Sequence, residues 1–74
     1  MAHLGPLPAR KVFRALQALG FQMVRQKGSH VLFQHPDGRA TVVPNHPTKE
    51  IHRGLLRQII QDADVSVEEF LEHT

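Results

Sequence analysis

The 74-residue chain contains no cysteine, no tryptophan and no tyrosine. Without cysteine it has no disulfide bonds, no thiolate nucleophile and no cysteine-based zinc site, and this composition fits the reducing cytoplasm. No apolar run approaches the roughly 18 residues that a membrane-spanning helix needs. Residues 1–8 do not show a cationic start followed by an apolar stretch, so we expect no signal peptide. The sequence therefore predicts a small cytoplasmic protein that does not enter a membrane.

Carboxylates are scarce in the first 61 residues, where Asp37 and Glu50 are the two acids. A two-metal nuclease needs a cluster of carboxylates, which these two residues do not supply. Four histidines raise the question of zinc: His30, His35, His46 and His52. Their spacing fits neither a helical ligand pair nor a short ligand loop. We therefore expect no metal and no cofactor.

The net charge of +2 hides a strong polarity along the chain. Residues 1–61 hold all nine Lys and Arg residues and two acids, and so carry a charge of +7. Residues 62–74 hold the other five acids and carry −5. A basic body indicates a polyanionic partner such as nucleic acid. A solvated basic surface followed by an acidic helix end is the alternative interpretation of the charge alone.

A single domain is expected over residues 1–74, with residues 1–7 as a flexible N-terminal tail. Pro8 suits the first position of a helix, and apolar residues at helical spacing predict that this helix ends at a glycine cap, Gly20. Turn residues then separate three predicted strands, at 21–27, 30–35 and 39–43.

Two further helices are expected after the strands. Residues 45–51 are expected to be irregular, and a helix begins between residues 48 and 54, with Gly54 as its candidate N-cap. Ser66 and Glu69 form a capping box for a last, short helix. The order α-β-β-β-α-α predicts an α+β fold of two layers, a three-stranded antiparallel sheet with the helices on one face. The other face of the sheet is expected to be open to solvent.

The most informative segment is the turn Gly28-Ser29 with His30 directly after it. Since side chains alternate along a strand, the bulky Phe33 should face the helices and His30 should point to the open face. Lys27 lies just before the turn. A histidine beside a glycine turn and cations is well placed to meet a phosphate, and imidazole moves protons near neutral pH.

Several motifs occur together along the chain. They are Gly20-Phe21, Arg25, Lys27-Gly28-Ser29-His30, Phe33, His35-Pro36-Asp37-Gly38-Arg39, Val42-Val43-Pro44-x-His46 and Lys49-Glu50-Ile51-x-x-Gly54. From about Val12 to Glu72, this combination resembles the HicA family of mRNA interferase toxins.

The resemblance implies a fold like that of double-stranded-RNA-binding domains, and it implies ribosome-independent cleavage of RNA. It also implies that His30, the histidine of the Gly-Ser-His motif, is the catalytic residue. A HicB-like antitoxin is the implied protein partner. The family commonly has threonine after the glycine that matches Gly54, whereas this chain has Leu55 and so lacks that hydroxyl.

The chemistry that these residues predict uses the RNA's own nucleophile, the 2′-hydroxyl group. His30 is the natural base to remove its proton. Arg25, Lys27 and the backbone N–H groups of Gly28 and Ser29 are expected to contact the RNA and to stabilise the charge on the phosphate.

The sequence does not assign the general acid. His35 and His46 are candidates by composition, but His35 is expected to face the core and His46 to lie in a loop. Three functions remain open: a metal-independent endoribonuclease, a non-catalytic RNA-binding module, and a protein-interaction domain whose basic face meets an acidic partner. His30 favours the first, because the other two need only Lys and Arg. The free protein is expected to be a monomer or a weak homodimer.

Overall fold

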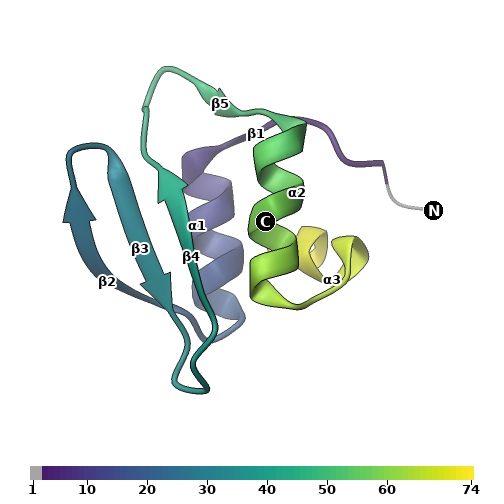
Figure 1. The fold of residues 1–74 in the computed structure, drawn as a ribbon. Coiled ribbons are helices and arrows are strands. Elements are labelled where there is room, and N and C mark those ends of the chain that lie inside the picture. The colour runs from purple at the N-terminus through teal and green to yellow at the C-terminus, as the bar shows by residue number, and fades with distance from the viewer. Residues whose placement is uncertain (1–2) are drawn as a thin grey trace.

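The structure is a computed structural model, and it describes residues 3–74. Its main elements are three helices and three strands (Figure 1). In chain order they are α1 (Ala9–Ala18), β2 (Gln22–Lys27), β3 (His30–Gln34), β4 (Ala40–Pro44), α2 (Arg53–Ala63) and α3 (Val67–Glu72). The predicted order α-β-β-β-α-α is confirmed, and each predicted strand boundary differs from the observed one by at most one residue.

The three strands form an antiparallel sheet in the order β2-β3-β4. In Figure 1, α1 lies behind this sheet and α2 lies beside β4, so one face of the sheet is covered and the face toward the viewer has no helix on it. Val31, Phe33 and Val43 are fully buried, and the Phe33 ring packs edge-on against Phe13 of α1 with 4.9 Å between centroids. The predicted two-layer α+β architecture is therefore confirmed.

The helices are amphipathic, and each contributes its apolar side to one core. Buried residues recur three and four positions apart: Val12, Ala15 and Leu16 in α1, and Leu56, Ile59, Ile60 and Ala63 in α2. Thr41 of β4 is the buried polar residue of the sheet, and its hydroxyl donates to the Asp62 carboxylate of α2 at 3.0 Å. Among residues 3–74, no helix combines the length and the apolar character that crossing a bilayer requires.

Gly20 lies just after the end of α1 and has a φ of +97°, a backbone conformation that side chains other than glycine rarely adopt. A Cβ at this position would also lie 2.8 Å from Nε2 of His35. The positive φ supports the predicted role of Gly20 in ending the helix. The short distance to His35 shows that the backbone at position 20 passes close to the end of β3, where a side chain would not fit.

A second, two-stranded sheet was not predicted. It pairs β1 (Leu7–Pro8) with β5 (Glu50–Ile51), with Leu7 opposite Ile51. Glu50 and Ile51 thus belong to a strand, although we expected residues 45–51 to be irregular. The two strands are too short to show an alternating pattern, and their pairing joins segments far apart in the sequence.

This pairing bears on the expected flexible tail at residues 1–7. Residues 1–2 lie outside the described residues. From Leu4 onward the segment packs against the body, because Leu4 is 6% exposed within the core and Leu7 takes part in the β1–β5 pair. The segment that leads into α1 is therefore held at both of these residues.

The start of α2 also differs from the expectation. Its N-cap is His52, whose Nδ1 accepts a hydrogen bond from the backbone N–H of Leu55 at 3.2 Å. Gly54 has no side-chain acceptor and is the second residue of the helix, so its expected role as N-cap was wrong. The imidazole supplies the capping acceptor, and the helix starts without a hydroxyl at position 55.

The start of α3 shows the serine half of the predicted capping box. Ser66 Oγ accepts a hydrogen bond from the backbone N–H of Glu69 at 3.0 Å. Phe70 is fully buried and Val65 packs against the same core. The short helix is thereby fixed to the rest of the domain at its first turn.

We predict that Leu4→Ala lowers the free energy of unfolding by roughly 2 kcal/mol, because it removes a side chain that is almost fully buried. The measurement is urea denaturation followed by circular dichroism. The matched control is His3→Ala, an exposed neighbour whose change should stay within about 0.5 kcal/mol. Equal free energies of unfolding for the two variants would contradict the packing of Leu4 against the core.

Candidate active site

The site is organised by the two-residue turn between β2 and β3. Lys27 and His30 are directly opposite each other in the strand register, and Gly28 and Ser29 connect them. Gly28 has a φ of +59°. A positive φ at the first turn residue suits hairpin connections of this length and favours glycine there. The turn chemistry therefore places a cation and an imidazole next to each other.

Strand register places the surrounding side chains on the open face. Arg25 is opposite Leu32, Leu32 is opposite Val42, and His30 is opposite Pro44. Directly opposed residues share a face of the sheet. His30 is exposed and Leu32 is half-buried, whereas Val31 and Phe33 between and beyond them are fully buried. The predicted exposure of His30 on the open face is confirmed.

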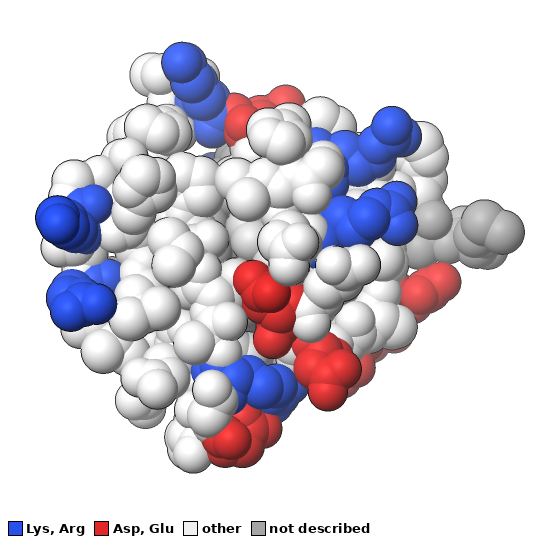
Figure 2. Space-filling model, viewed as in Figure 1, with Lys and Arg blue, Asp and Glu red and all other residues white. Residues whose placement is uncertain are grey.

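These side chains line an open hollow of about 440 Å³. Its lining residues are Arg25, Gln26, Lys27, His30, Leu32 and Val42. Figure 2 shows basic side chains at the edge of the sheet formed by β2 and few charges over the middle of the strands. The hollow thus has a cationic rim, an apolar floor and one imidazole, a combination that suits a phosphate attached to a less polar group.

The turn is held from both sides by hydrogen bonds to its carbonyl groups. The Gln26 side chain donates to the carbonyl of Gly28 at 3.0 Å, and the backbone N–H of Asn45 donates to the carbonyl of Ser29 at 2.6 Å. The second bond continues the β3–β4 pairing by one residue beyond Pro44. Both carbonyls are therefore engaged within the protein, which fixes the turn next to His30.

His46 reaches this turn as well. Its Nε2 lies 3.5 Å from Oγ of Ser29. The sequence placed His46 in a loop and did not connect it to the turn. The available clue was its position two residues after Pro44, the residue opposite His30, since pairing that continues past the strand end brings this position to the turn.

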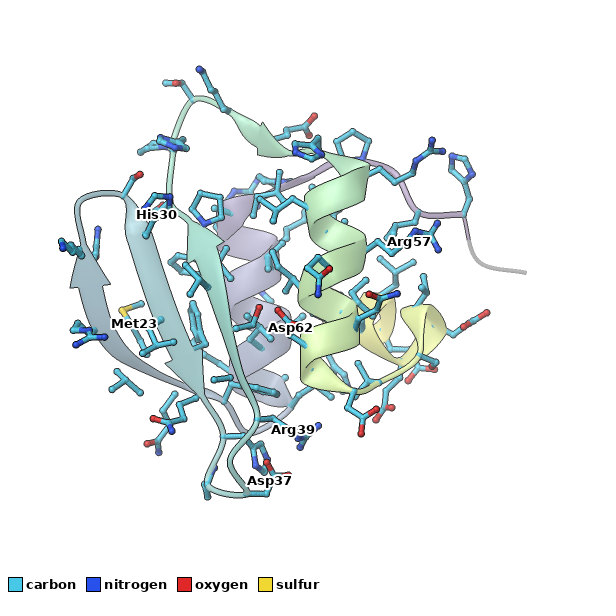
Figure 3. All side chains as sticks on the ribbon, in the orientation of Figure 1. Met23, His30, Asp37, Arg39, Arg57 and Asp62 are labelled. Atoms are coloured by element: carbon cyan, nitrogen blue, oxygen red, sulfur yellow. The ribbon has the colours of Figure 1, made fainter. Side chains whose placement is uncertain are left out.

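His35 lies at the other end of β3 and does not join the site. Its Nδ1 accepts a hydrogen bond from the backbone N–H of Asp37 at 3.1 Å, and its ring packs edge-on against the buried Phe21 with 5.2 Å between centroids. Figure 3 shows the turn at Asp37 at the opposite end of the hairpin from His30. His35 therefore stabilises the β3–β4 turn, in agreement with the expectation that it faces the core.

At that distant turn, Asp37 and Arg39 form an ion pair. The Arg39 Nε donates to both carboxylate oxygens of Asp37, at 2.9 and 3.1 Å. Hydrogen bonding from Arg39 holds the pKa of Asp37 below its ordinary value. Arg39 also donates to the carbonyl of Ala63 at the end of α2 and lies over the Phe21 ring. Its positive charge is committed to the fold, in contrast to the exposed Arg25 and Lys27.

Within residues 3–74, no three His, Asp or Glu side chains converge as a metal site would require. The four histidines considered for zinc are spread over both ends of the sheet and the start of α2. The groups in the hollow that can take part in a reaction are an imidazole, two cations and hydrogen-bonding groups.

A comparison with protein families finds a match over most of the chain. Residues 9–65 match the family described as "HicA toxin of bacterial toxin-antitoxin". A search of the curated proteins found no match. The matched range contains the whole hollow, the turn and His46.

Proposed function

Since the chain belongs to the HicA family of toxins from bacterial toxin–antitoxin systems, we propose that it is an endoribonuclease that cleaves mRNA without a metal ion. The observation that carries this proposal is His30, an exposed imidazole directly opposite Lys27 in a hollow with a cationic rim. An mRNA substrate places this activity in the cytoplasm. The free toxin is proposed to act as a monomer or a weak homodimer.

In the proposed reaction, His30 is the general base. Its unprotonated nitrogen takes the proton of an RNA 2′-hydroxyl, and the 2′-oxygen attacks the adjacent phosphorus. The bond from phosphorus to the 5′-oxygen breaks, so that the products end in a 2′,3′-cyclic phosphate and a 5′-hydroxyl. A correctly placed base of this kind contributes about 10²–10⁴-fold to a rate.

Arg25 and Lys27 are proposed to bind the phosphates. Both share the open face with His30, and neither makes an ion pair in the described structure. Their charges are therefore available to the negative charge that develops on the phosphate oxygens. The N–H groups of Gly28 and Ser29 are proposed as further donors, because the carbonyls of this turn are already engaged and its conformation is fixed.

The same face is proposed to bind a HicB-like antitoxin. The large apolar side chains that are exposed on the sheet are Met23, Val24 and Val42, at 46%, 55% and 46% exposure. Met23 is opposite the buried Phe33 and lies on the other face of the sheet, whereas Val42 is opposite Leu32 and therefore shares the open face with Arg25 and Lys27. This gives the open face apolar area beside its charge. An antitoxin with acidic and apolar groups would exclude RNA by covering it, with charge pairing that speeds association.

We expect His30→Ala to abolish RNA cleavage while the free energy of unfolding changes by no more than about 0.5 kcal/mol, because the side chain is exposed. The assay follows an end-labelled RNA on a denaturing gel, with thermal unfolding as the test of folding. His3→Ala is the matched control and should cleave like the wild type. A folded His30→Ala protein with wild-type activity would contradict the assignment, and wild-type RNA binding without any cleavage would favour the non-catalytic binding module.

Metal independence is tested in the same assay. Excess EDTA should leave the cleavage rate unchanged, and the products should carry a 2′,3′-cyclic phosphate or the monophosphate formed by its hydrolysis. The end groups are identified by mass spectrometry. Loss of activity in EDTA that magnesium or zinc restores would overturn this mechanism.

Lys27→Glu should weaken both RNA binding and antitoxin binding, and should reduce the salt dependence of each, since both partners are proposed to use this cation. Binding is measured by fluorescence anisotropy at several salt concentrations. The control is Arg57→Glu, which makes the same change of charge on exposed α2, away from the β2 edge (Figure 3). Loss of RNA binding with unchanged antitoxin affinity would show that the two partners use different surfaces.

A further inference from the structure

A second imidazole borders the same turn as His30. The hydrogen bond from Asn45 to the carbonyl of Ser29 extends the β3–β4 pairing, and the next residue, His46, then reaches the turn. Its Nε2 is 3.5 Å from Ser29 Oγ, and Ser29 directly precedes His30. His46 is exposed, so its ring is free to meet a bound molecule.

Two of the other histidines are engaged in holding the fold. His35 is held by the Asp37 turn at the far end of β3, and His52 accepts a hydrogen bond as the N-cap of α2. Two of the carboxylates are likewise paired, Asp37 with Arg39 and Asp62 with Thr41 and Gln58, whereas Glu50 lines a hollow together with His46. His46 is thus the second imidazole that the structure brings to the turn, in addition to His30.

We propose that His46 is the general acid of the RNA cleavage and that Ser29 positions its ring. The inference rests on the proposed function. When the bond between phosphorus and the 5′-oxygen breaks, the leaving oxygen carries the electron pair of that bond and needs a proton. Protonated His46 donates that proton and becomes neutral, while His30 has taken the proton of the 2′-hydroxyl. One proton is gained and one is lost, and water restores both rings for the next cycle.

Ser29 suits the role of a positioning residue. A hydroxyl donates and accepts hydrogen bonds, so it is a partner for the imidazole in either protonation state. Ser29 is half-buried and its backbone is fixed by Asn45. A ring that must alternate between two charge states is thereby kept next to the turn throughout the cycle.

Charged groups lie with His46 in two separate hollows. On the side of α1, Arg10 lines a hollow of about 210 Å³ together with His46 and Asn45. On the other side, a second hollow of about 210 Å³ is lined by His46 with Lys49, Glu50 and His52. Each hollow thus brings a cation near His46, Arg10 in the first and Lys49 beside Glu50 in the second, and these cations can contact the phosphates that continue beyond the cleaved one.

The test compares two forms of one short RNA that the wild-type toxin cleaves at a mapped position. One form has the normal phosphodiester, and the other has sulfur in place of the 5′-bridging oxygen. A thiolate leaves without protonation, so a general acid is needed only for the oxygen form. The wild-type protein, His46→Gln, His30→Gln and the exposed control His3→Gln are measured on both forms. Affinity for a non-cleavable 2′-O-methyl RNA is measured in parallel.

We expect His46→Gln to lose about 10²–10⁴-fold in the cleavage rate of the oxygen form and to cleave the sulfur form at close to the wild-type rate. His30→Gln should lose activity on both forms, and His3→Gln on neither. The wild-type rate should rise and then fall with pH, because the base must be neutral and the acid protonated. His46→Gln should lose the fall at high pH, and Ser29→Ala should lose part of the rate on the oxygen form alone.

Other outcomes separate the inference from the proposed function. Cleavage that depends on His30 but not on His46 would overturn the role of His46 and leave the endoribonuclease intact. Equal losses on both RNA forms, with weaker binding of the 2′-O-methyl RNA, would assign His46 to binding and equally reject the acid. Absence of cleavage by the wild-type protein would overturn both.

Discussion

The alternation of side chains along β3 is the constraint on which the rest of the structure depends. Val31 and Phe33 are fully buried against the helices, and His30 and Leu32 therefore point to the opposite face. A slip of the strand by one residue would expose the first pair and bury the imidazole. Burying each large apolar side chain contributes about 1.5–3 kcal/mol, so the core fixes the register and, with it, the side on which the chemistry takes place. Buried residues that do not contact a substrate therefore determine on which face the site lies.

The tight turn between β2 and β3 determines which side chains lie next to His30. Because only Gly28 and Ser29 separate the two strands, Lys27 and His30 are paired, and the end of β4 is brought to the same place through Asn45. His30 and His46, which lie sixteen positions apart in the sequence, thus border one turn. Sequence spacing alone does not show this relation, because it depends on how far strand pairing continues past Pro44.

The features that follow from local rules were predictable from the sequence. Strand alternation predicted the exposure of His30, and the capping pattern predicted the contact between Ser66 and Glu69. The features that depend on partners distant in the sequence, or on unusual residue types, were not predictable from the sequence. The pairing of Leu7 with Ile51 carries no periodic signal in strands of two residues, and histidine at the start of α2 is outside the usual set of capping residues. Glycine is among the residues commonly preferred at the N-cap, which is why the sequence predicted Gly54. The actual acceptor is the side chain of His52, two residues earlier.

A domain of this size has one core, and here the core lies on the helix side of the sheet. The proposed reacting groups must then stand in the open, where solvent and salt weaken each charge. A polyanion offsets this weakness, because several exposed cations act together on a chain of phosphates. Arg39 shows the contrast, since its charge is used on Asp37 and α2 and is not offered to a ligand. Under the proposed function, a partner inhibits this open site by occupying the face. In that proposed complex the exposed Val24 and Val42 would become buried, a stabilisation that the free protein does not have.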